Sequence, residues 1–272
     1  MLNINTNIYS LTAQTNLNST QNMLSQAINR LSSGKRVNSA ADDAAGLAIS
    51  TSMTSSVNAL NQGVSNANNG VSMIQTASSA LSAITSNLQR IRQLAVQASD
   101  ASIGTDAAAN LDTEVQARIT EIGRIASQTT FNGIKVLDGS AGANLNFQIG
   151  ESSGQQLTID LSGKYDATTL GLTGDVKTAT TAQSMMDTID TALKTVNTAQ
   201  ATLGSNLNIF QSAISQTTAQ STNLSAASAQ ITDANFAQET ANLSKAQVLQ
   251  QAGISVLAQA NSMPQQVLKL LG

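Results

Sequence analysis

Three long stretches of the chain contain no charged residue, and each still repeats apolar residues with helical spacing: residues 1–29, 44–89 and 195–232. A helix in contact with water normally carries Glu, Lys and Arg on its outer faces. Here those positions hold Ser, Thr, Asn, Gln and Ala instead. We therefore expect long helices whose surfaces are built for close contact with other helices.

Heptad seams run through the second and third of these stretches. One seam places apolar residues alternately three and four positions apart from Met53 to Leu88, and another does so from Ile189 to Ile231. This is the spacing of the a and d positions of a coiled coil. Because the two seams need only each other, we expect them to form the core of a helical bundle within one chain.

The two ends of the chain carry weaker seams that contain many small residues. Two helices of ~30 residues with such a seam bury too little surface to be stable alone. We therefore expect the terminal seams to be contacts for self-assembly. The residues assigned to them are Leu17, Leu24, Leu31, Leu243, Ala246, Gly253, Leu257, Ala260, Val267 and Leu271.

Cap and breaker signals divide the helical part of the chain. Gly34 can take the left-handed conformation that ends a helix. The spacing of Ser39 and Asp42 resembles a capping box, and the carboxylates of Asp42 and Asp43 are expected to stabilise the start of the next helix. The helices expected from these signals cover residues 5–31, 44–99, 111–126 and 182–231 and a terminal segment whose seam runs over 243–271.

The periodicity changes from helical to two in the region 131–162. Apolar residues alternate with polar ones from Leu145 to Ile149 and again from Leu157 to Leu161, across a stretch that contains glycine. This pattern predicts a β-hairpin. Residues 163–180 are rich in Thr and Gly and are expected to form a loop.

Together these elements predict a mainly α protein, a long antiparallel helical hairpin or coiled-coil bundle with a small central β-hairpin region. We expect two domains. Residues 1–42 and 233–272 would form a terminal coiled-coil domain, and residues 43–232 a helical rod domain that contains the hairpin region and the loop.

The composition excludes most chemical functions. The chain has no cysteine and no histidine, which removes thiolate and imidazole nucleophiles, disulfides and the usual zinc ligands, so we expect neither an enzyme nor a cofactor. A net charge of -3 without a dense basic patch argues against nucleic acid as a partner. No apolar run approaches the ~20 residues of a membrane span, so membrane insertion is not expected, and residues 1–16 lack the pattern of a secretory signal peptide.

Several longer motifs are specific to one protein family. They are Ile4-Asn5-Thr6-Asn7, the run from Arg30 to Gly46, the segment Leu88–Gln97, the segment Phe131–Leu137, and near the other end Ser244–Gly253, Val256–Asn261 and Leu270-Leu271-Gly272. In this order the motifs strongly resemble bacterial flagellin, over roughly residues 1–161 and 182–272.

The resemblance implies a structural subunit that self-assembles into the bacterial flagellar filament. It also implies export as an unfolded chain through the flagellar type III apparatus and a secreted, extracellular location. The terminal domain would then be the filament core, and residues 163–180 would stand in place of the outer domains of longer relatives. The implied partners are further copies, an export chaperone, the filament cap and hook-junction proteins. The alternatives are a hook–filament junction protein and another type III secreted coiled-coil protein.

The resemblance further implies recognition by Toll-like receptor 5. Gln89, Arg90, Leu94 and Glu114 match positions that contact the receptor in the family. On this interpretation Leu94 is the apolar anchor, Arg90 a forked donor and Glu114 a charged acceptor. Gln93 stands where many relatives carry Glu. We expect the filament to cover this patch.

Overall fold

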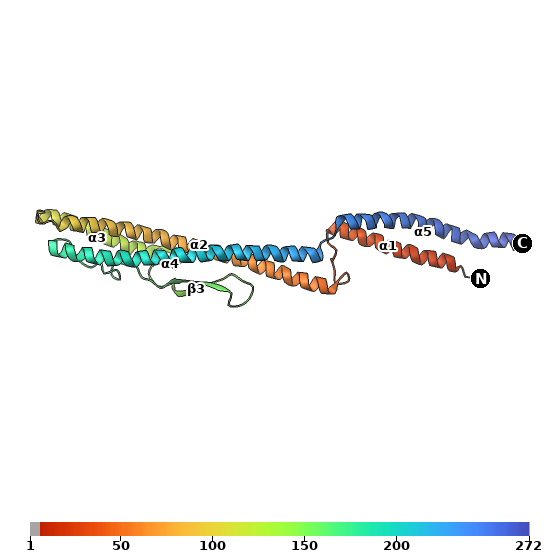
Figure 1. Ribbon diagram of the computed structural model, residues 1–272, viewed down its shortest axis with the longest axis horizontal. Helices are drawn as coiled ribbons and strands as arrows, with labels where there is room; N and C mark the ends of the chain where they lie inside the picture. Colours follow the sequence, from red (N-terminus) through yellow and green to blue (C-terminus); the bar gives the residue numbers. More distant parts are fainter. Residues whose placement is uncertain (1–5, 272) are drawn as a thin grey trace. The chain divides into compact units, whose positions relative to one another are not determined.

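The computed structural model describes the main chain of residues 6–271 and the side chains of residues 6–263. This part of the chain contains five α-helices and two small antiparallel sheets (Figure 1), which confirms a mainly α fold with a central β region. The elements are α1 (Ile8–Ser33), α2 (Ala44–Ala98), α3 (Thr105–Gln128), β1 (Thr130–Phe131), β2 (Ile134–Lys135), β3 (Gly142–Gln148), β4 (Gln156–Leu161), α4 (Ala179–Thr232) and α5 (Phe236–Leu271).

The chain divides into two compact units. The first consists of Met1–Ser55 with Asn223–Gly272, and the second of Ser56–Thr222. In the first unit, α1 and α5 lie side by side (Figure 1). In the second unit, α2, α3 and α4 form a helical bundle, and the β3–β4 hairpin lies against it.

The core of the second unit is made by the two seams expected from the sequence, joined by one face of α3. Seam residues from both long helices are buried: Leu60, Ile74, Leu81 and Leu88 of α2, and Ile189, Val196, Leu203 and Phe210 of α4. From α3, Val115 and Ile122 join the same cluster. Burial of each large apolar side chain contributes about 1.5–3 kcal/mol, so this continuous cluster stabilises helices whose own propensity is poor.

Two glycines let α2 come into close contact with its neighbours. A Cβ atom added at Gly63 would lie 2.0 Å from the main-chain oxygen of Ile149, and one added at Gly70 would lie 2.3 Å from the ring of Phe210. That ring in turn meets Phe147 edge to face, with ring centres 5.6 Å apart. The hairpin, α2 and α4 therefore pack without space for an added methyl group at either glycine.

The hairpin register agrees with the alternation in the sequence. Leu145 pairs with Ile159 and Phe147 with Leu157 across the antiparallel strands β3 and β4. Ile149, expected in the first strand, lies just beyond its end, where its N–H group bonds the carbonyl oxygen of Gln155.

A second, smaller hairpin was not expected. β1 and β2 pair through Thr130 with Lys135 and Phe131 with Ile134. The connecting residues Asn132 and Gly133 both have positive φ, 48° and 80°. An Asn-Gly pair is a strong signal for such a two-residue turn, whereas strands of two residues are too short to show alternation.

The loop between β4 and α4 is fixed by α3. The buried carboxylate of Asp112 accepts a hydrogen bond from the N–H group of Val176 at 3.1 Å. The side chain of Gln116 donates to the carbonyl oxygen of Gly174 at 2.8 Å. Since Leu172 and Val176 are buried in the core, this short loop is an ordered part of the unit.

The end of α1 agrees with the sequence prediction, whereas the start of α2 differs from it. Gly34 ends α1 in the left-handed conformation, as expected. The predicted capping box is wrong, because α2 begins only at Ala44 and the Ser39 hydroxyl donates to Asp42 instead of accepting a main-chain N–H group. Asp42 accepts from the N–H group and the hydroxyl of Ser39, both at 3.0 Å, in the turn before the helix. These bonds lower the pKa of Asp42. Asp43 instead caps α2, accepting from the N–H group of Gly46 at 2.9 Å.

Candidate functional site

Small residues bring α1 and α5 close together in the first unit. Ala13 and Ala27 of α1 and Ala246 and Ala260 of α5 are buried. A methyl carbon of Leu17 lies 3.4 Å from the point where a Cβ atom of Gly253 would be, so this leucine packs directly on the glycine. The predicted seam therefore runs between two helices of the same chain.

The side chains of the predicted seam are placed as follows. Leu17, Leu24, Leu31, Leu243, Gly253 and Leu257 are half-buried, and Ala246 and Ala260 are buried. The side chains of Val267 and Leu271 lie outside the described residues, as do Ile4 and Asn5 of the first family motif. The seam residues thus do not supply the exposed apolar surface of this unit.

Polar bonds along the pair define its antiparallel direction. Asn7 accepts from the N–H group of Ser10 at 3.1 Å, which caps α1, and its own amide donates to the carbonyl oxygen of Ala260 at 2.7 Å. Further along, Gln250 donates to Gln21 at 3.2 Å. One side chain, Asn7, therefore both starts α1 and attaches it to α5.

Residues of the longest family motif attach the end of α1 to α5 and the connector after α1 to the last turn of α4. Arg30 forms an ion pair with the largely buried Glu239 at 3.2 Å. The guanidinium group of Arg36 donates to the carbonyl oxygen of Ile231 at 2.7 Å. Removing one partner of a buried ion pair leaves an uncompensated charge, so the Arg30–Glu239 pair fixes how the two helices meet.

A second set of large apolar side chains lies off the seam and is exposed. We call this set the outer apolar surface. It comprises Ile8, Tyr9, Leu11, Met23 and Ile28 of α1 and Phe236, Val248, Leu249, Ile254, Val256 and Met263 of α5. Phe236 is 71% exposed and Val256 is 54% exposed. Large apolar side chains exposed in this number on one helix pair indicate an interaction surface.

A groove crosses the outer apolar surface between the two helices. Its volume is about 400 Å³, and its walls include Leu17 and Met23 from α1 and Leu249 and Val256 from α5. No charged side chain lines it. The groove suits apolar side chains of another helix, and the heptad analysis missed it because its walls combine seam and off-seam positions.

A separate, charged patch lies on α2 and α3 in the second unit. Both nitrogens on one edge of the Arg90 guanidinium group donate to the carboxylate of Glu114, at 2.9 and 3.2 Å. Gln93 accepts from the same guanidinium group at 3.4 Å, and Gln89 is exposed beside it. The bond from Arg90 lowers the pKa of Glu114 and raises that of the arginine.

The structure corrects the role expected for Leu94. Its side chain is only 2% exposed and belongs to the core of the second unit, with Ile91 and Leu88. A side chain so deeply buried cannot enter a pocket of another protein while the unit is folded. The exposed apolar residue nearest along the helix is Val96.

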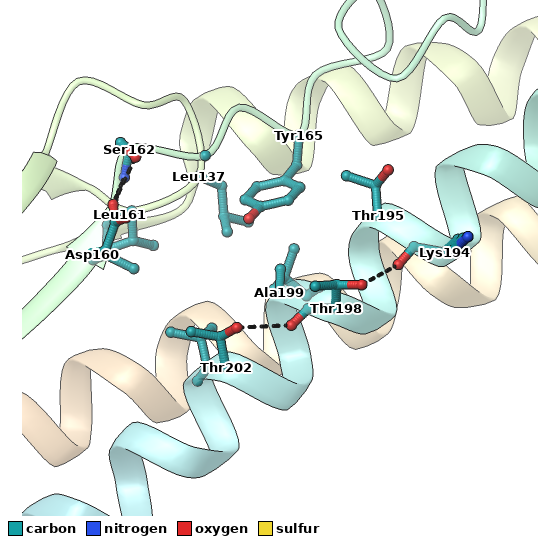
Figure 2. Close-up of a pocket in the computed structure, with 14 residues that line it drawn as sticks. Leu137, Asp160, Leu161, Ser162, Tyr165, Lys194, Thr195, Thr198, Ala199 and Thr202 are labelled. Atoms are coloured by element: carbon teal, nitrogen blue, oxygen red, sulfur yellow. Dashed lines mark hydrogen bonds between the residues drawn. The ribbon is translucent and has the colours of Figure 1, made fainter.

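A pocket of about 500 Å³ lies between the end of β4 and α4. Figure 2 shows the ring of Tyr165 between Leu137 and α4, with Asp160 bonded to Ser162 at the rim. Burial and then the charge of Asp160 raise the pKa of Tyr165, whereas the bonds from Ser162 lower the pKa of Asp160. The phenol thus stays protonated and the carboxyl ionised at neutral pH, which is not the pairing of a nucleophile with a base.

Neither a metal site nor a membrane span is found where the structure describes the chain. Among the described side chains, those of residues 6–263, no group of three or more acidic side chains is placed to hold a metal ion. None of the helices in residues 6–271 is sufficiently long and apolar to cross a bilayer.

Two regions of the chain match one protein family. Residues 4–142 match the bacterial flagellin N-terminal helical region, and residues 186–271 match the bacterial flagellin C-terminal helical region. A flagellin of Xenorhabdus nematophila is 39% identical and covers 98% of both chains. A flagellin of Halalkalibacterium halodurans is also 39% identical, over 98% of this chain and 99% of its own.

Solved structures share the fold. The crystal structure of Bacillus cereus flagellin is similar with a TM-score of 0.51 and 32% identity, over 60% of this chain and 94% of its own. A putative flagellar hook-associated protein from Vibrio parahaemolyticus has a TM-score of 0.60 over 71% of this chain and 100% of its own, but only 12% identity. The second likeness is therefore one of fold alone.

Proposed function

The chain belongs to the bacterial flagellin family and is a structural subunit of the flagellar filament, and from this premise we propose that the outer apolar surface of α1 and α5 is where one copy contacts the next. The observation that carries this proposal is the exposure of eleven large apolar side chains on one helix pair. Water contact with these side chains is unfavourable by about 25 cal/mol per Å² of apolar area. A neighbouring copy that covered them would remove that cost.

The pairing of α1 with α5 has a supporting role in this proposal. The seam positions, Leu17 and Leu257 among them, hold the two helices together and so arrange the outer apolar surface. The groove beside Val256 would receive apolar side chains of a neighbouring copy. A head-to-tail contact between unlike surfaces can repeat without closing, which gives a helical filament.

Three consecutive residues of α5 provide the test. Ser255 and Val256 are exposed, and Leu257 is half-buried toward the seam. Val256→Asp places a charge in the proposed contact of every subunit, at a cost of several kcal/mol, and we expect it to abolish filament formation. Ser255→Asp adds the same charge one position away and should still assemble. Leu257→Asp should also prevent assembly, through the loss of the helix pair.

The measurements are electron microscopy and sedimentation of the purified protein after seeding with filament fragments. Thermal unfolding followed by circular dichroism checks that the unit Ser56–Thr222 is unchanged in all three variants. Filaments of normal stability from Val256→Asp would show that the outer apolar surface is not the subunit contact.

The assignment of domains follows the same reasoning. We propose that residues 1–42 and 233–272 form the filament core and that residues 43–232 form the surrounding helical rod. Export of the chain unfolded, an extracellular location, and contacts with an export chaperone, the filament cap and hook-junction proteins are proposed from the family. Assembly into long filaments, rather than a short junction, would distinguish a filament subunit from a hook–filament junction protein.

Recognition by Toll-like receptor 5 is proposed for the charged patch alone. Gln89 and Arg90 of α2 are exposed, and Glu114 of the neighbouring α3 is half-buried. Bidentate arginine pairs are frequent anchors of protein interfaces. Leu94 is excluded as an inserted anchor, because it is part of the core.

Arg92 supplies a matched control for this second proposal. Arg92 bonds Asp190 in the same forked way, at 2.7 and 3.2 Å, and is exposed to 47%, against 45% for Arg90. In a cell reporter assay with monomer, Arg90→Ala should weaken signalling and Arg92→Ala should not. Equal signalling by wild type and Arg90→Ala would contradict the assignment.

A further inference from the structure

The chain contains two Asn-Gly dipeptides, Asn69-Gly70 and Asn132-Gly133. In such a pair the main-chain nitrogen of the glycine can attack the side-chain carbonyl carbon of the asparagine, because glycine has no Cβ atom to shield the nitrogen. Both asparagine side chains are exposed. Exposure alone therefore does not distinguish the two sites, and the main chain around them must.

The Asn132-Gly133 dipeptide is held weakly. It forms the turn between β1 and β2, which are two residues each, and both β2 residues are exposed. Within the part of the chain that the structure describes, neither the side chain of Asn132 nor the N–H group of Gly133 makes a hydrogen bond. Ring closure requires this turn to leave its left-handed conformation, and short exposed hairpins open at low free energy.

The Asn69-Gly70 dipeptide is held firmly. It lies inside α2, between residues 44 and 98, with several helical turns on either side. Gly70 is buried against the ring of Phe210. Rotation of this main chain would break helix hydrogen bonds in the middle of the core, where the opening free energy approaches that of global unfolding.

We propose that Asn132 is a site of spontaneous deamidation in the folded protein and that Asn69 is protected. The nitrogen of Gly133 loses its proton and bonds to the Cγ atom of Asn132. The bond from Cγ to Nδ2 breaks, and the NH2 group takes up a proton and leaves as ammonia. Water then opens the succinimide at one of its two carbonyl carbons, which leaves aspartate or isoaspartate at position 132. The reaction consumes one water molecule and needs no oxidant or enzyme.

The modification changes a part of the second unit that leads into its core. Isoaspartate adds one carbon atom to the main chain of a two-residue turn, which is incompatible with the pairing of Thr130 with Lys135. The next residues, Val136 and Leu137, are fully buried. The net charge changes from -3 to -4 because a neutral amide becomes a carboxylate.

The experiment incubates the full-length monomer at mildly alkaline pH and follows both sites by mass spectrometry. Trypsin cleaves after Arg124 and Lys135, so Asn132 lies in the short peptide 125–135. Isoaspartate is confirmed by labelling with isoaspartyl methyltransferase. We expect Asn132 to react at least roughly tenfold faster than Asn69 in the native protein, because their opening free energies differ strongly.

The same incubation in concentrated urea is the control, since it removes the structure from both sites. There the two rates should become similar. The proposal is overturned if the native rate at Asn132 is as low as that at Asn69, or if the difference between the sites persists in urea, because the fold would then not be its cause.

Discussion

Replacing Gly63 by alanine tests how closely the β3–β4 hairpin lies on α2. The added Cβ atom would meet the carbonyl oxygen of Ile149 at 2.0 Å, and about 1.4 Å of retreat is needed to reach the 3.4 Å of an ordinary contact. The obstacle is main chain, so no side-chain rotation relieves it. The retreat would also strain the bond from the Asn66 amide to the carbonyl oxygen of Gln148, now 2.9 Å.

The expected magnitude comes from two opposing effects. Alanine is favoured over glycine inside a helix by about 1 kcal/mol. Overpacking a core costs about 1–3 kcal/mol, and a main-chain obstacle places Gly63→Ala at the upper end. The net change should be a loss of about 2 kcal/mol in the free energy of unfolding.

Gly204 of α4 is the matched control for this prediction. It is exposed inside a long helix, and a Cβ atom there would meet nothing within 4 Å. Gly204→Ala should therefore gain about 1 kcal/mol. Urea unfolding followed by circular dichroism should show the midpoint lowered by Gly63→Ala and raised by Gly204→Ala. A raised midpoint for both variants would refute the close contact between the hairpin and α2.

Three further predictions concern the core, the chain ends and acid. Leu94→Ala should lower the free energy of unfolding by about 2–5 kcal/mol, as truncation of a buried leucine usually does. Arg90→Ala, on the exposed face of the same helix, should change this free energy little. Equally small effects of both variants in urea unfolding would contradict the core position of Leu94. Limited proteolysis should trim the free subunit to a core of about residues 45–232, because α1 and α5 have low helical propensity and their outer apolar surface is covered only by neighbouring copies. Assembled subunits should resist cleavage, and equal resistance in both states argues against ordering on assembly. Hydrogen bonds from Arg92 to Asp190, from Arg90 to Glu114 and from Ser140 to Asp138 lower the pKa of each carboxyl. The contribution of these bonds to the free energy of unfolding is therefore complete above the unfolded pKa values near 4 and is lost as pH falls through the lower folded values. A free energy of unfolding that stays constant in this acid range would contradict the prediction.

The sequence by itself determined the helices, the β3–β4 hairpin and most of the core. Apolar spacing identified α2 and α4 because a helix of fifteen turns repeats its signal many times, and alternation identified the β3–β4 register because one face of that hairpin is buried. Gly34 ended α1 as predicted, since only a residue without a side chain adopts that conformation freely. These features depend on local periodicity or local chemistry, which the order of residues contains.

The tertiary structure decided which apolar side chains are covered. Leu94 and Val96 are two positions apart in one helix, yet one is 2% and the other 49% exposed, because α3 and α4 lie against only part of the α2 surface. In the terminal pair, Val256 and Leu257 are neighbours of similar hydrophobicity, and only the approach of α1 to α5 separates an exposed side chain from a seam position. The physical reason is that burial of apolar area is favourable whichever neighbour covers it, because the hydrophobic effect is non-directional. The pattern of residues therefore defines which faces of a helix can be buried. The packing of helices that are distant in sequence determines which of these faces stays exposed.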